Sequence, residues 1–220
     1  MITSLSAVLP EYCVVVFDLD DTLYPERAFV QSGFRAVARY VEQECAANVY
    51  SALCKIWDAG DRDPLGKITA EFGLPGPKSE LIEIYRTHIP ELTLVANVKE
   101  LLSTLRTAGH AIGIMTDGRS STQRNKIRML GLDAWAEDIL ISEEFGSAKP
   151  AERNYRHFEG RFPRRKFAFV GNDPAKDFVT ANRLGWQTIC ILDPGDHIHP
   201  QAFDRVPVEA HPQYVMERLA

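Results

Sequence analysis

Residues 12–22 read YCVVVFDLDDT, and this stretch joins an unbroken apolar run to a group of carboxylates. The first six residues are mostly β-branched or aromatic and do not alternate with polar ones, which is typical of a strand covered on both faces. We therefore expect the run to lie at the centre of a parallel sheet. Asp18 and Asp20 follow it, at the strand end where open parallel sheets bind ligands. In an extended chain these two side chains point to the same side.

Four further apolar runs predict the other strands, and they cover residues 111–115, 139–141, 167–170 and 188–192. Helical patterns that end at a glycine separate them and cover residues 97–109, 120–131 and 173–185. The expected N-caps of these helices are Asn97, Ser120 and Asp173. A terminal helix is expected from Tyr214 to Leu219. Alternating strands and helices of this length predict an α/β fold with a doubly wound parallel sheet.

The interval between the first two strands is much longer than a helical crossover needs. Asp18 and Thr116 lie 98 residues apart, whereas a βαβ unit closes in roughly 30 residues. The surplus has helical periodicity, with breaks at residues 61–64 and 73–77. We therefore predict a helical cap domain over residues 25–95, inserted into an α/β core formed by residues 1–24 and 96–220. Such an insertion can close over a site as a lid.

Composition and charge exclude several classes of protein. The chain has 220 residues, of which 45% are hydrophobic and 25% charged, as in an ordinary folded protein. A net charge of −5 argues against a general affinity for nucleic acid or anionic membranes. Because the N-terminal region resembles neither a membrane helix nor a signal peptide, we expect a cytoplasmic protein. The cysteines lack CxxC spacing and are expected to be small buried hydrophobes; they are Cys13, Cys45, Cys54 and Cys190.

Polar residues follow the other predicted strands as well. They are Thr116, Asp117, Gly118, Lys149, Asp173 and Asp177. Each feature alone is ordinary, because a Thr-Asp-Gly turn, a surface lysine and an aspartate N-cap are all common. Together they occur in order at the edge of the sheet where Asp18 and Asp20 are expected. Paired carboxylates at such an edge need a cation or a retained proton, and both are useful in phosphate chemistry.

This set resembles the motifs of the haloacid dehalogenase-like (HAD) hydrolase superfamily, which has a Rossmann-like core. The matching residues are Asp18-Leu19-Asp20-Asp21-Thr22, Thr116, Lys149 and Gly171-Asn172-Asp173 with Asp177. The insertion between the first and second motifs, and Gln123 and Lys126 after the second, are similar to the capped subfamily. The resemblance covers about residues 12–192. One departure is Asp117, where many relatives have Asn, and it bears on substrate contacts more than on the chemistry.

The resemblance implies a Mg²⁺-dependent phosphatase that works through an aspartyl-phosphate. Asp18 would attack phosphorus, and Asp20, protonated at the start, would protonate the leaving oxygen and then activate water. Mg²⁺ would be held by the carboxylates of Asp18 and Asp173 and by the backbone carbonyl of Asp20. Lys149 would neutralise Asp18 and a phosphoryl oxygen. The residues expected to bind the phosphate or substrate are Thr116, Asp117, Gly118 and Lys149.

Three acidic or hydroxyl residues of the same motifs are expected to act outside the reaction itself, or not at all. Thr22 would hold the loop, and Asp177 would orient Lys149 or a metal-bound water. Asp21 is expected to be solvated or remote from the metal. His197 and His199 form an H-x-H that is expected to be an ordinary loop.

Several alternatives stay open. A phosphotransferase of the phosphoglucomutase type would keep both acids, so the sequence separates it poorly from a phosphatase. A 2-haloacid dehalogenase has no use for a metal ligand at Asp173, and a phosphoacceptor signalling domain would carry its acids on different strands. The substrate could be a nucleotide, a sugar phosphate or a phosphorylated acid. We expect no nucleic-acid or membrane partner, and the sequence does not indicate an oligomeric state.

Overall fold

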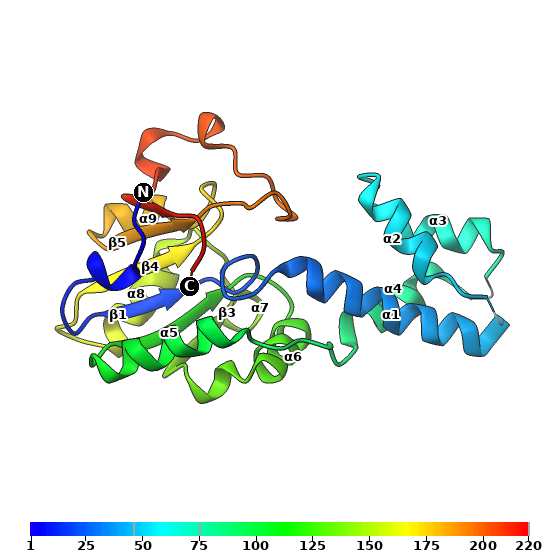
Figure 1. Cartoon of the computed structure of the whole chain (residues 1–220), viewed down its shortest axis with the longest axis horizontal. Coiled ribbons are helices and arrows are strands. Elements are labelled where there is room, and N and C mark those ends of the chain that lie inside the picture. The colour runs from blue at the N-terminus through cyan, green and yellow to red at the C-terminus, as the bar shows by residue number, and fades with distance from the viewer. Residues whose placement is uncertain (46, 75, 220) are drawn as a thin grey trace.

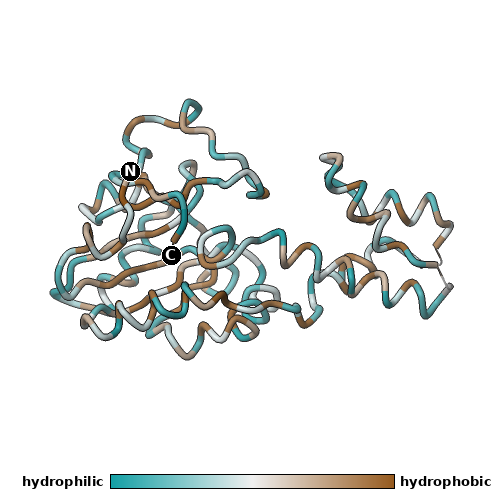
Figure 2. The backbone as a smooth tube through the Cα atoms, viewed as in Figure 1, coloured by the Kyte–Doolittle hydropathy of each residue, from teal (hydrophilic) through white to brown (hydrophobic). Residues whose placement is uncertain are grey.

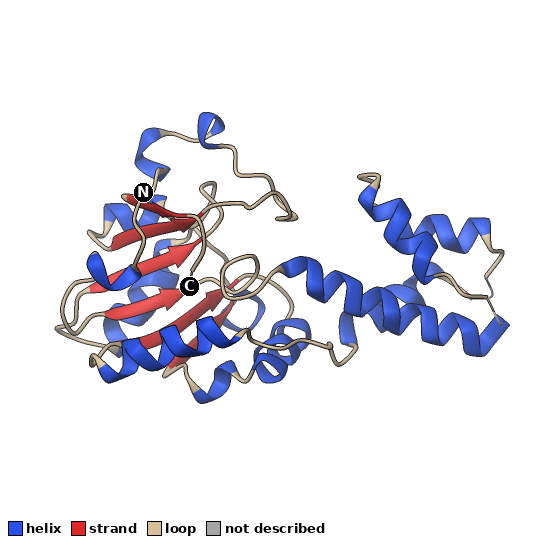
Figure 3. Ribbon diagram, in the orientation of Figure 1, coloured by secondary structure: helices blue, strands red, loops and turns tan. Residues whose placement is uncertain are grey.

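The structure is a computed structural model that describes residues 1–45, 47–74 and 76–219, and the statements below concern these residues. A parallel sheet with the strand order β3-β2-β1-β4-β5-β6 lies at its centre (Figure 3). The strands are β1 (Val14–Phe17), β2 (Ala111–Thr116), β3 (Asp138–Ile141), β4 (Phe167–Gly171), β5 (Gln187–Ile191) and β6 (Tyr214–Met216). β1 lies between β2 and β4, so the first apolar run is central, as predicted.

The register aligns the ends of the three central strands. Phe17, the last residue of β1, lies opposite Ile114 of β2 and Val170 of β4. All four β1 residues are buried, which explains why the run is apolar without alternation. The chain therefore leaves β1, β2 and β4 at one edge of the sheet, the edge that the carboxylates occupy.

Helices cover both faces of this sheet (Figure 1). They are α5 (Ala96–Thr107), α6 (Ser120–Leu130), α7 (Ser142–Phe145), α8 (Glu152–Arg161) and α9 (Val179–Arg183). Leu102 of α5 and Ile127 of α6 share one hydrophobic cluster with Val15 of β1. Phe158 of α8 shares the cluster on the opposite face with Val16. Adjacent residues of β1 thus bury opposite faces of a doubly wound sheet, which confirms the predicted fold class.

Two predicted N-caps are wrong by one or two residues. α5 begins after Val95, and the Asn97 side chain accepts a hydrogen bond from the next backbone N–H instead of capping the helix. α6 begins at Ser120 itself, whose hydroxyl donates to Glu144 Oε1 at 2.5 Å. The helix therefore begins one residue earlier than the local pattern predicts, with Arg119 at the N-cap position, and the Ser120 hydroxyl proton is donated to a partner 24 residues away in sequence.

The predictions near the C-terminal end need larger corrections. Asp173 does not cap a helix, because α9 begins only at Val179; its Oδ1 accepts from Ala175 N at 2.9 Å within a turn. The helix expected from Tyr214 to Leu219 is wrong, because β6 forms there and pairs in parallel with β5. A three-residue edge strand carries too few residues to show a period of two.

The long insertion forms helices beyond the carboxyl edge of the sheet. They are α1 (Glu26–Cys45), α2 (Tyr50–Asp58), α3 (Pro64–Glu71) and α4 (Lys78–Thr87). They share a hydrophobic cluster of their own, which includes Phe34, Leu53 and Ile68. Hydrophobic and hydrophilic positions alternate along them, as expected for helices that bury one face (Figure 2). The predicted break at 73–77 includes residue 75, which lies outside the described residues.

Two expectations from composition can be compared with the structure. No helix of the described residues is long and apolar enough to cross a membrane. Cys13 and Cys190 are buried free thiols, as expected, whereas Cys54 is only half-buried. The side chain of Cys45 lies outside the described part of the structure.

Candidate active site

The acidic residues predicted from the strand ends gather around one small cavity. Asp18 follows β1, Thr116 ends β2, and Asn172 and Asp173 follow β4. All four line a cavity of about 90 Å³, together with Asp20. Residues that lie up to 155 positions apart in sequence therefore share one site, because β1, β2 and β4 end at the same edge.

Lys149 lies behind this cavity and joins two carboxylates. Its Nζ lies 2.8 Å from Asp18 Oδ1 and 2.7 Å from Asp177 Oδ1, and the lysine side chain is fully buried. The other oxygen of Asp177 accepts hydrogen bonds from the backbone N–H groups of Asn172 and Asp173 at 3.1 and 2.9 Å. Asp177 thus fixes both the lysine and the turn that presents Asp173, without facing the cavity itself.

Burial and the neighbouring charges act in opposite directions on the pKa values of Asp18 and Lys149. Burial raises the pKa of Asp18 to about 6, although Lys149 opposes the shift. Burial alone would lower the pKa of Lys149, but Asp177 and Asp18 outweigh it and raise that pKa. Lys149 is therefore a permanent cation beside Asp18, and the Asp18 carboxylate is available near neutral pH.

Asp20 is held on the side of the cavity nearest the insertion. Lys126 Nζ of α6 lies 2.7 Å from Asp20 Oδ1, Gln123 Nε2 donates to Oδ2 at 3.0 Å, and the Tyr24 hydroxyl also donates to Oδ1. Burial would raise the pKa of Asp20, but Lys126 and these hydrogen bonds outweigh it and lower the pKa. This differs from the protonated starting form that the resemblance implies, because the present arrangement favours the carboxylate.

Three of the residues expected to bind the phosphate or substrate already have hydrogen-bond partners in the protein. Thr116 Oγ1 accepts a hydrogen bond from Gln123 Nε2 at 2.6 Å, which leaves its own proton free to be donated. The Gly118 N–H donates to Ser142 Oγ at 2.9 Å, so an anion would have to displace that bond. Asp117 Oδ1 accepts from the Lys149 backbone N–H at 3.1 Å and thereby positions the lysine segment.

Asp21 was expected to be solvated or remote from the metal, and the first alternative is wrong. Its side chain is 4% exposed. Oδ1 accepts from the backbone N–H of Glu26, the first residue of α1, at 2.7 Å, and Oδ2 accepts from Ile198 N at 3.0 Å. A single carboxylate thus joins the first turn of α1 to the loop after β5. The second partner lies 177 residues away in sequence, which is why the local pattern did not reveal it.

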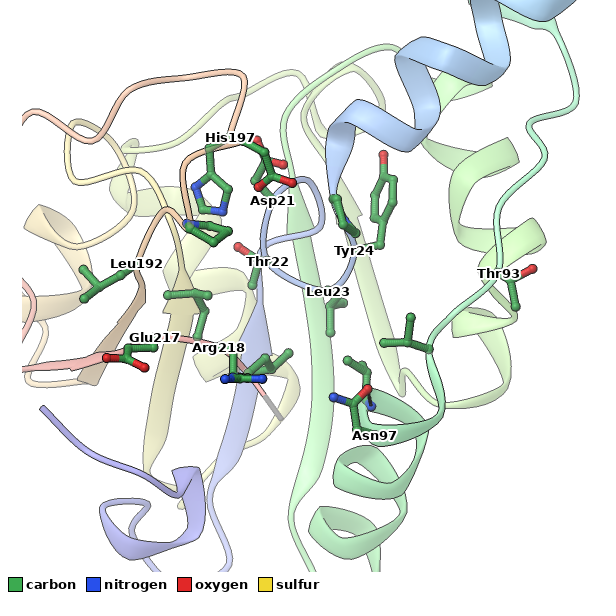
Figure 4. Close-up of a pocket in the computed structure, with 17 residues that line it drawn as sticks. Asp21, Thr22, Leu23, Tyr24, Thr93, Asn97, Leu192, His197, Glu217 and Arg218 are labelled. Carbon is green, nitrogen blue, oxygen red and sulfur yellow. Dashed lines mark hydrogen bonds between the residues drawn. The ribbon is translucent and has the colours of Figure 1, made fainter.

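A larger cavity lies on the other side of the loop that carries Asp21. It has a volume of about 280 Å³ and is lined by Asp21, Thr22 and His197 among others, but not by Asp18, Asp20, Thr116 or Asp173. Figure 4 shows His197 on the loop after β5 and Thr22 on the loop that follows β1, both at this cavity. Thr22 Oγ1 is buried with no hydrogen-bond partner among the described residues. The residues expected to be catalytic therefore converge on the smaller cavity and not on this one.

The sequence interpretation missed three residues that line the small cavity. They are Glu26, Lys176 and His199. His199 lies in the loop that was expected, but that loop turns back towards the first motif through the bond between Ile198 and Asp21. Local patterns carry no sign of this approach, because it depends on how the loop after β5 packs.

The donor set suits a small hard cation. Among the described residues, no group of three His, Cys, Asp or Glu side chains is arranged as a ready-made metal site. Mg²⁺ does not require one, because it binds through one or two carboxylates and keeps several waters or substrate oxygens. Asp18 and Asp173 line the same cavity and supply two such carboxylates. The residues present therefore fit Mg²⁺.

Comparison with known proteins places this site in a family. The sequence profile described as haloacid dehalogenase-like hydrolase matches residues 15–191. The chain belongs to the haloacid dehalogenase-like hydrolases. It is therefore an enzyme of the hydrolase class, and the motifs that carried the resemblance are those of its own family.

Individual relatives of this HAD hydrolase share less than a third of its residues. The chain is 28% identical to the ribulose-1,5-bisphosphate 5-phosphatase of Halopiger xanaduensis, over 93% of this chain and 95% of the relative. It is 29% identical to the glyceraldehyde 3-phosphate phosphatase of Methanocaldococcus jannaschii, over 81% and 84%. A magnesium-bound HAD hydrolase of Bacillus subtilis superposes with a TM-score of 0.65 over 96% of both chains. At 20% identity, the last similarity supports the fold alone.

Proposed function

We propose that this HAD hydrolase is a phosphatase that hydrolyses a small-molecule phosphate monoester with Asp18 as nucleophile and Mg²⁺ as cofactor. The observation that carries the proposal is the buried contact of Lys149 with Asp18, which lines the small cavity together with Thr116, Asp20 and Asp173. The names of the two relatives support it, since both are phosphatases of small sugar phosphates.

The first step forms a bond between an Asp18 oxygen and phosphorus and breaks the bond to the leaving oxygen. Lys149 stabilises the negative charge of the carboxylate and the phosphoryl oxygens, and the Thr116 hydroxyl donates to one of them. Asp20 gives its proton to the departing oxygen. Because Lys126 favours the ionised form of Asp20, this step requires that the ion pair loosen and Asp20 take up a proton beforehand.

The second step returns the protein to its starting form. Asp20, now a carboxylate, takes a proton from water as the water oxygen attacks phosphorus, and the bond between phosphorus and Asp18 breaks. Inorganic phosphate leaves and Asp20 is again protonated. The contacts from Lys126, Gln123 and Tyr24 hold the Asp20 carboxylate in place for this second role.

The carboxylates of Asp18 and Asp173 and the backbone carbonyl of Asp20 would hold Mg²⁺. When bound, the ion neutralises charge on the phosphoryl group that is transferred. Asp177 supports this arrangement from behind, because its two oxygens are engaged by Lys149 and by the turn at Asn172 and Asp173. In this proposal the helices of residues 25–95 form a cap over a core of residues 1–24 and 96–220, and Thr22 belongs to the loop between them.

The test is phosphate release from a panel of sugar phosphates, nucleotides and phosphorylated acids, with and without Mg²⁺. Asp18→Asn removes the nucleophile while Lys149 keeps its contact with Asp177, so we expect a folded protein whose rate falls at least about a thousandfold. Asp133→Asn is the matched control, because Asp133 is exposed and lines no part of the site. Undiminished phosphate release by Asp18→Asn would overturn the proposal.

A further inference from the structure

A second cavity adjoins the small one and lies within the inserted helices. It has a volume of about 400 Å³, and Glu26 lines both cavities. The cavity of about 280 Å³ also shares a residue, Asp21, with the small one, but it is the smaller of the two neighbours. A phosphate held beside Asp18 therefore has, in the cavity of the inserted helices, a neighbouring space large enough for the rest of a small molecule. In Figure 1, α1 starts at the edge of the sheet where β1 ends and leads away from it.

One wall of this second cavity follows a single face of α1. Glu26, Val30 and Phe34 line it at intervals of four residues, and at a rise of 1.5 Å per residue they span about 12 Å. Val30 and Phe34 are buried and form its apolar base. Ile198 lines it from the loop after β5, whose backbone N–H also donates to Asp21. The space is thus continuous from the first motif outwards along α1.

The acidic residues that line this cavity have cationic partners, whereas two of its arginines have no acidic partner among the described residues. Three acids line it. Asp61 Oδ2 lies 2.6 Å from Lys67 Nζ, and Asp63 Oδ1 lies 2.6 Å from Lys78 Nζ. Glu26 Oε1 lies 4.0 Å from Lys126 Nζ, so each of the three acids has a cation beside it. Arg62 and Arg86 also line the cavity. In the part of the chain that the structure describes, neither guanidinium has an acidic partner. The unmatched charge of the cavity is therefore positive.

Arg86 is the better placed of the two. It is half-buried in the last turn of α4, whereas Arg62 is exposed in the loop before α3. The Arg86 carbonyl accepts a hydrogen bond from Thr122 Oγ1 of α6 at 3.0 Å, and α6 also carries the Lys126 that contacts Asp20. Arg86 therefore lies where the insertion meets the catalytic part of the chain.

We propose that the leaving group of the substrate carries a second anionic group, a carboxylate or a second phosphate, and that Arg86 binds it. This inference rests on the proposed phosphatase function and narrows its substrate class. The planar guanidinium matches both anions with paired hydrogen bonds. A neutral leaving group would leave that charge unmatched next to the reacting phosphate.

Arg86 also has a simpler use, because a cation in the last turn of a helix stabilises the helix dipole. Arg128 provides the matched control, since it is an exposed arginine in the last turn of α6 and lines neither cavity. An effect of the dipole alone would lower the melting temperature of Arg86→Gln without changing its preference between substrates.

The experiment compares kcat/KM for two matched pairs of substrates in wild type, Arg86→Gln, Arg86→Lys and Arg128→Gln. The pairs are 3-phosphoglycerate with glycerol 3-phosphate, which tests a carboxylate, and fructose 1,6-bisphosphate with fructose 6-phosphate, which tests a second phosphate. We expect the kcat/KM of Arg86→Gln to fall about 10- to 100-fold for the member of one pair that carries the second anionic group, and little for the member that carries only the reacting phosphate. Arg86→Lys should recover part of the loss, and Arg128→Gln should match wild type.

Binding to an inactive protein separates this inference from the proposed function. Calorimetry with Asp18→Asn should show the anionic member of that pair binding about 10- to 100-fold more weakly once Arg86→Gln is added. The inference is wrong, although the phosphatase function stands, if Arg86→Gln weakens the binding of both members of each pair equally. It is also wrong if wild type prefers the members that lack the second anionic group. If the binding difference is present but no substrate is hydrolysed, the phosphatase function fails and the recognition by Arg86 stands.

Discussion

Replacing Lys126 with methionine tests the electrostatic arrangement around Asp20. Methionine keeps the length and apolar stem of the lysine but removes the ammonium group, which is 3% exposed and lies 2.7 Å from Asp20 Oδ1. The substitution also removes the cation that lies 4.3 Å from the centre of the Phe29 ring. Asp20 is left with hydrogen bonds from Tyr24 and Gln123 and, among the residues that the structure describes, with no cation in contact.

The expected loss of stability follows from burial. Two unit charges about 4 Å apart attract by about 4 kcal/mol at the effective dielectric of a protein, and removing one partner of a buried pair costs about 3–5 kcal/mol. The Asp20 side chain is 19% exposed and keeps two donors, so we expect a cost at or just below the lower limit of this range, about 2–3 kcal/mol at pH 7. For a protein of this length the melting temperature should fall by about 4–12 °C.

The sign of the pH dependence is a second readout of the same variant. In wild type the pKa of Asp20 lies below its ordinary value, so the stabilisation is present at neutral pH and lost only as pH falls through that low pKa. In the variant, burial is no longer opposed by Lys126, so the pKa of Asp20 rises above its unfolded value. The native variant then binds protons more readily than its unfolded chain, and its deficit should shrink between pH 7 and pH 5.

Thermal and urea unfolding at both pH values measure this difference. Arg124→Met is the control, because Arg124 lies on the same helix and pairs with Glu144 at the surface, where such a pair contributes roughly 0–1 kcal/mol. Adding Asp20→Asn to Lys126→Met removes the unpaired charge and should restore part of the loss. A Lys126→Met protein as stable as wild type at pH 7, or a deficit that grows towards pH 5, would refute the reasoning.

Three further predictions concern the support and loading of the site. Gly171→Ala places a Cβ 2.4 Å from Asp177 Oδ2, so the melting temperature and the rate of phosphate release should both fall. Gly160→Ala is the control: no atom of the described residues lies near its Cβ on the exposed surface of α8, so its melting temperature should stay the same or rise. Tyr155→Phe loses the hydroxyl that donates to the Asp177 carbonyl at 3.0 Å, which should cost about 1 kcal/mol in urea unfolding. Mg²⁺ should raise the melting temperature of wild type but not of Asp173→Asn, and chelation should abolish phosphate release; an equal rise in both proteins argues against Asp173 as a ligand.

The sequence predicted the sheet well because its central strands are buried on both faces. β1, β2 and β4 consist of continuous apolar residues, and their burial requires that composition. β6 was predicted wrongly because an edge strand of three residues pairs on one side only and needs no particular pattern. Two helix starts were also misplaced by one or two residues, because α5 and α6 begin after Val95 and Arg119, neither of which has a capping side chain that a pattern could reveal.

The site was predictable to the extent that its residues follow strands. Asp18, Thr116 and Asp173 lie together because parallel strands end at a common edge. The partners of Asp20 and Asp21 were not predictable from local patterns, because Lys126 and Ile198 reach them from α6 and from the loop after β5. The motif indicates which groups react, whereas their protonation depends on neighbours that only the fold brings into contact.

Chemical trapping of the intermediate tests the central claim most directly. The protein is mixed with Mg²⁺ and a substrate labelled in its phosphate group, quenched in acid during the first turnovers, and digested. We predict label on the peptide that contains Asp18, and neither label nor turnover in Asp18→Asn. Steady turnover by wild type with no labelled Asp18 peptide at any quench time, or phosphate release by Asp18→Asn at the wild-type rate, would contradict the account.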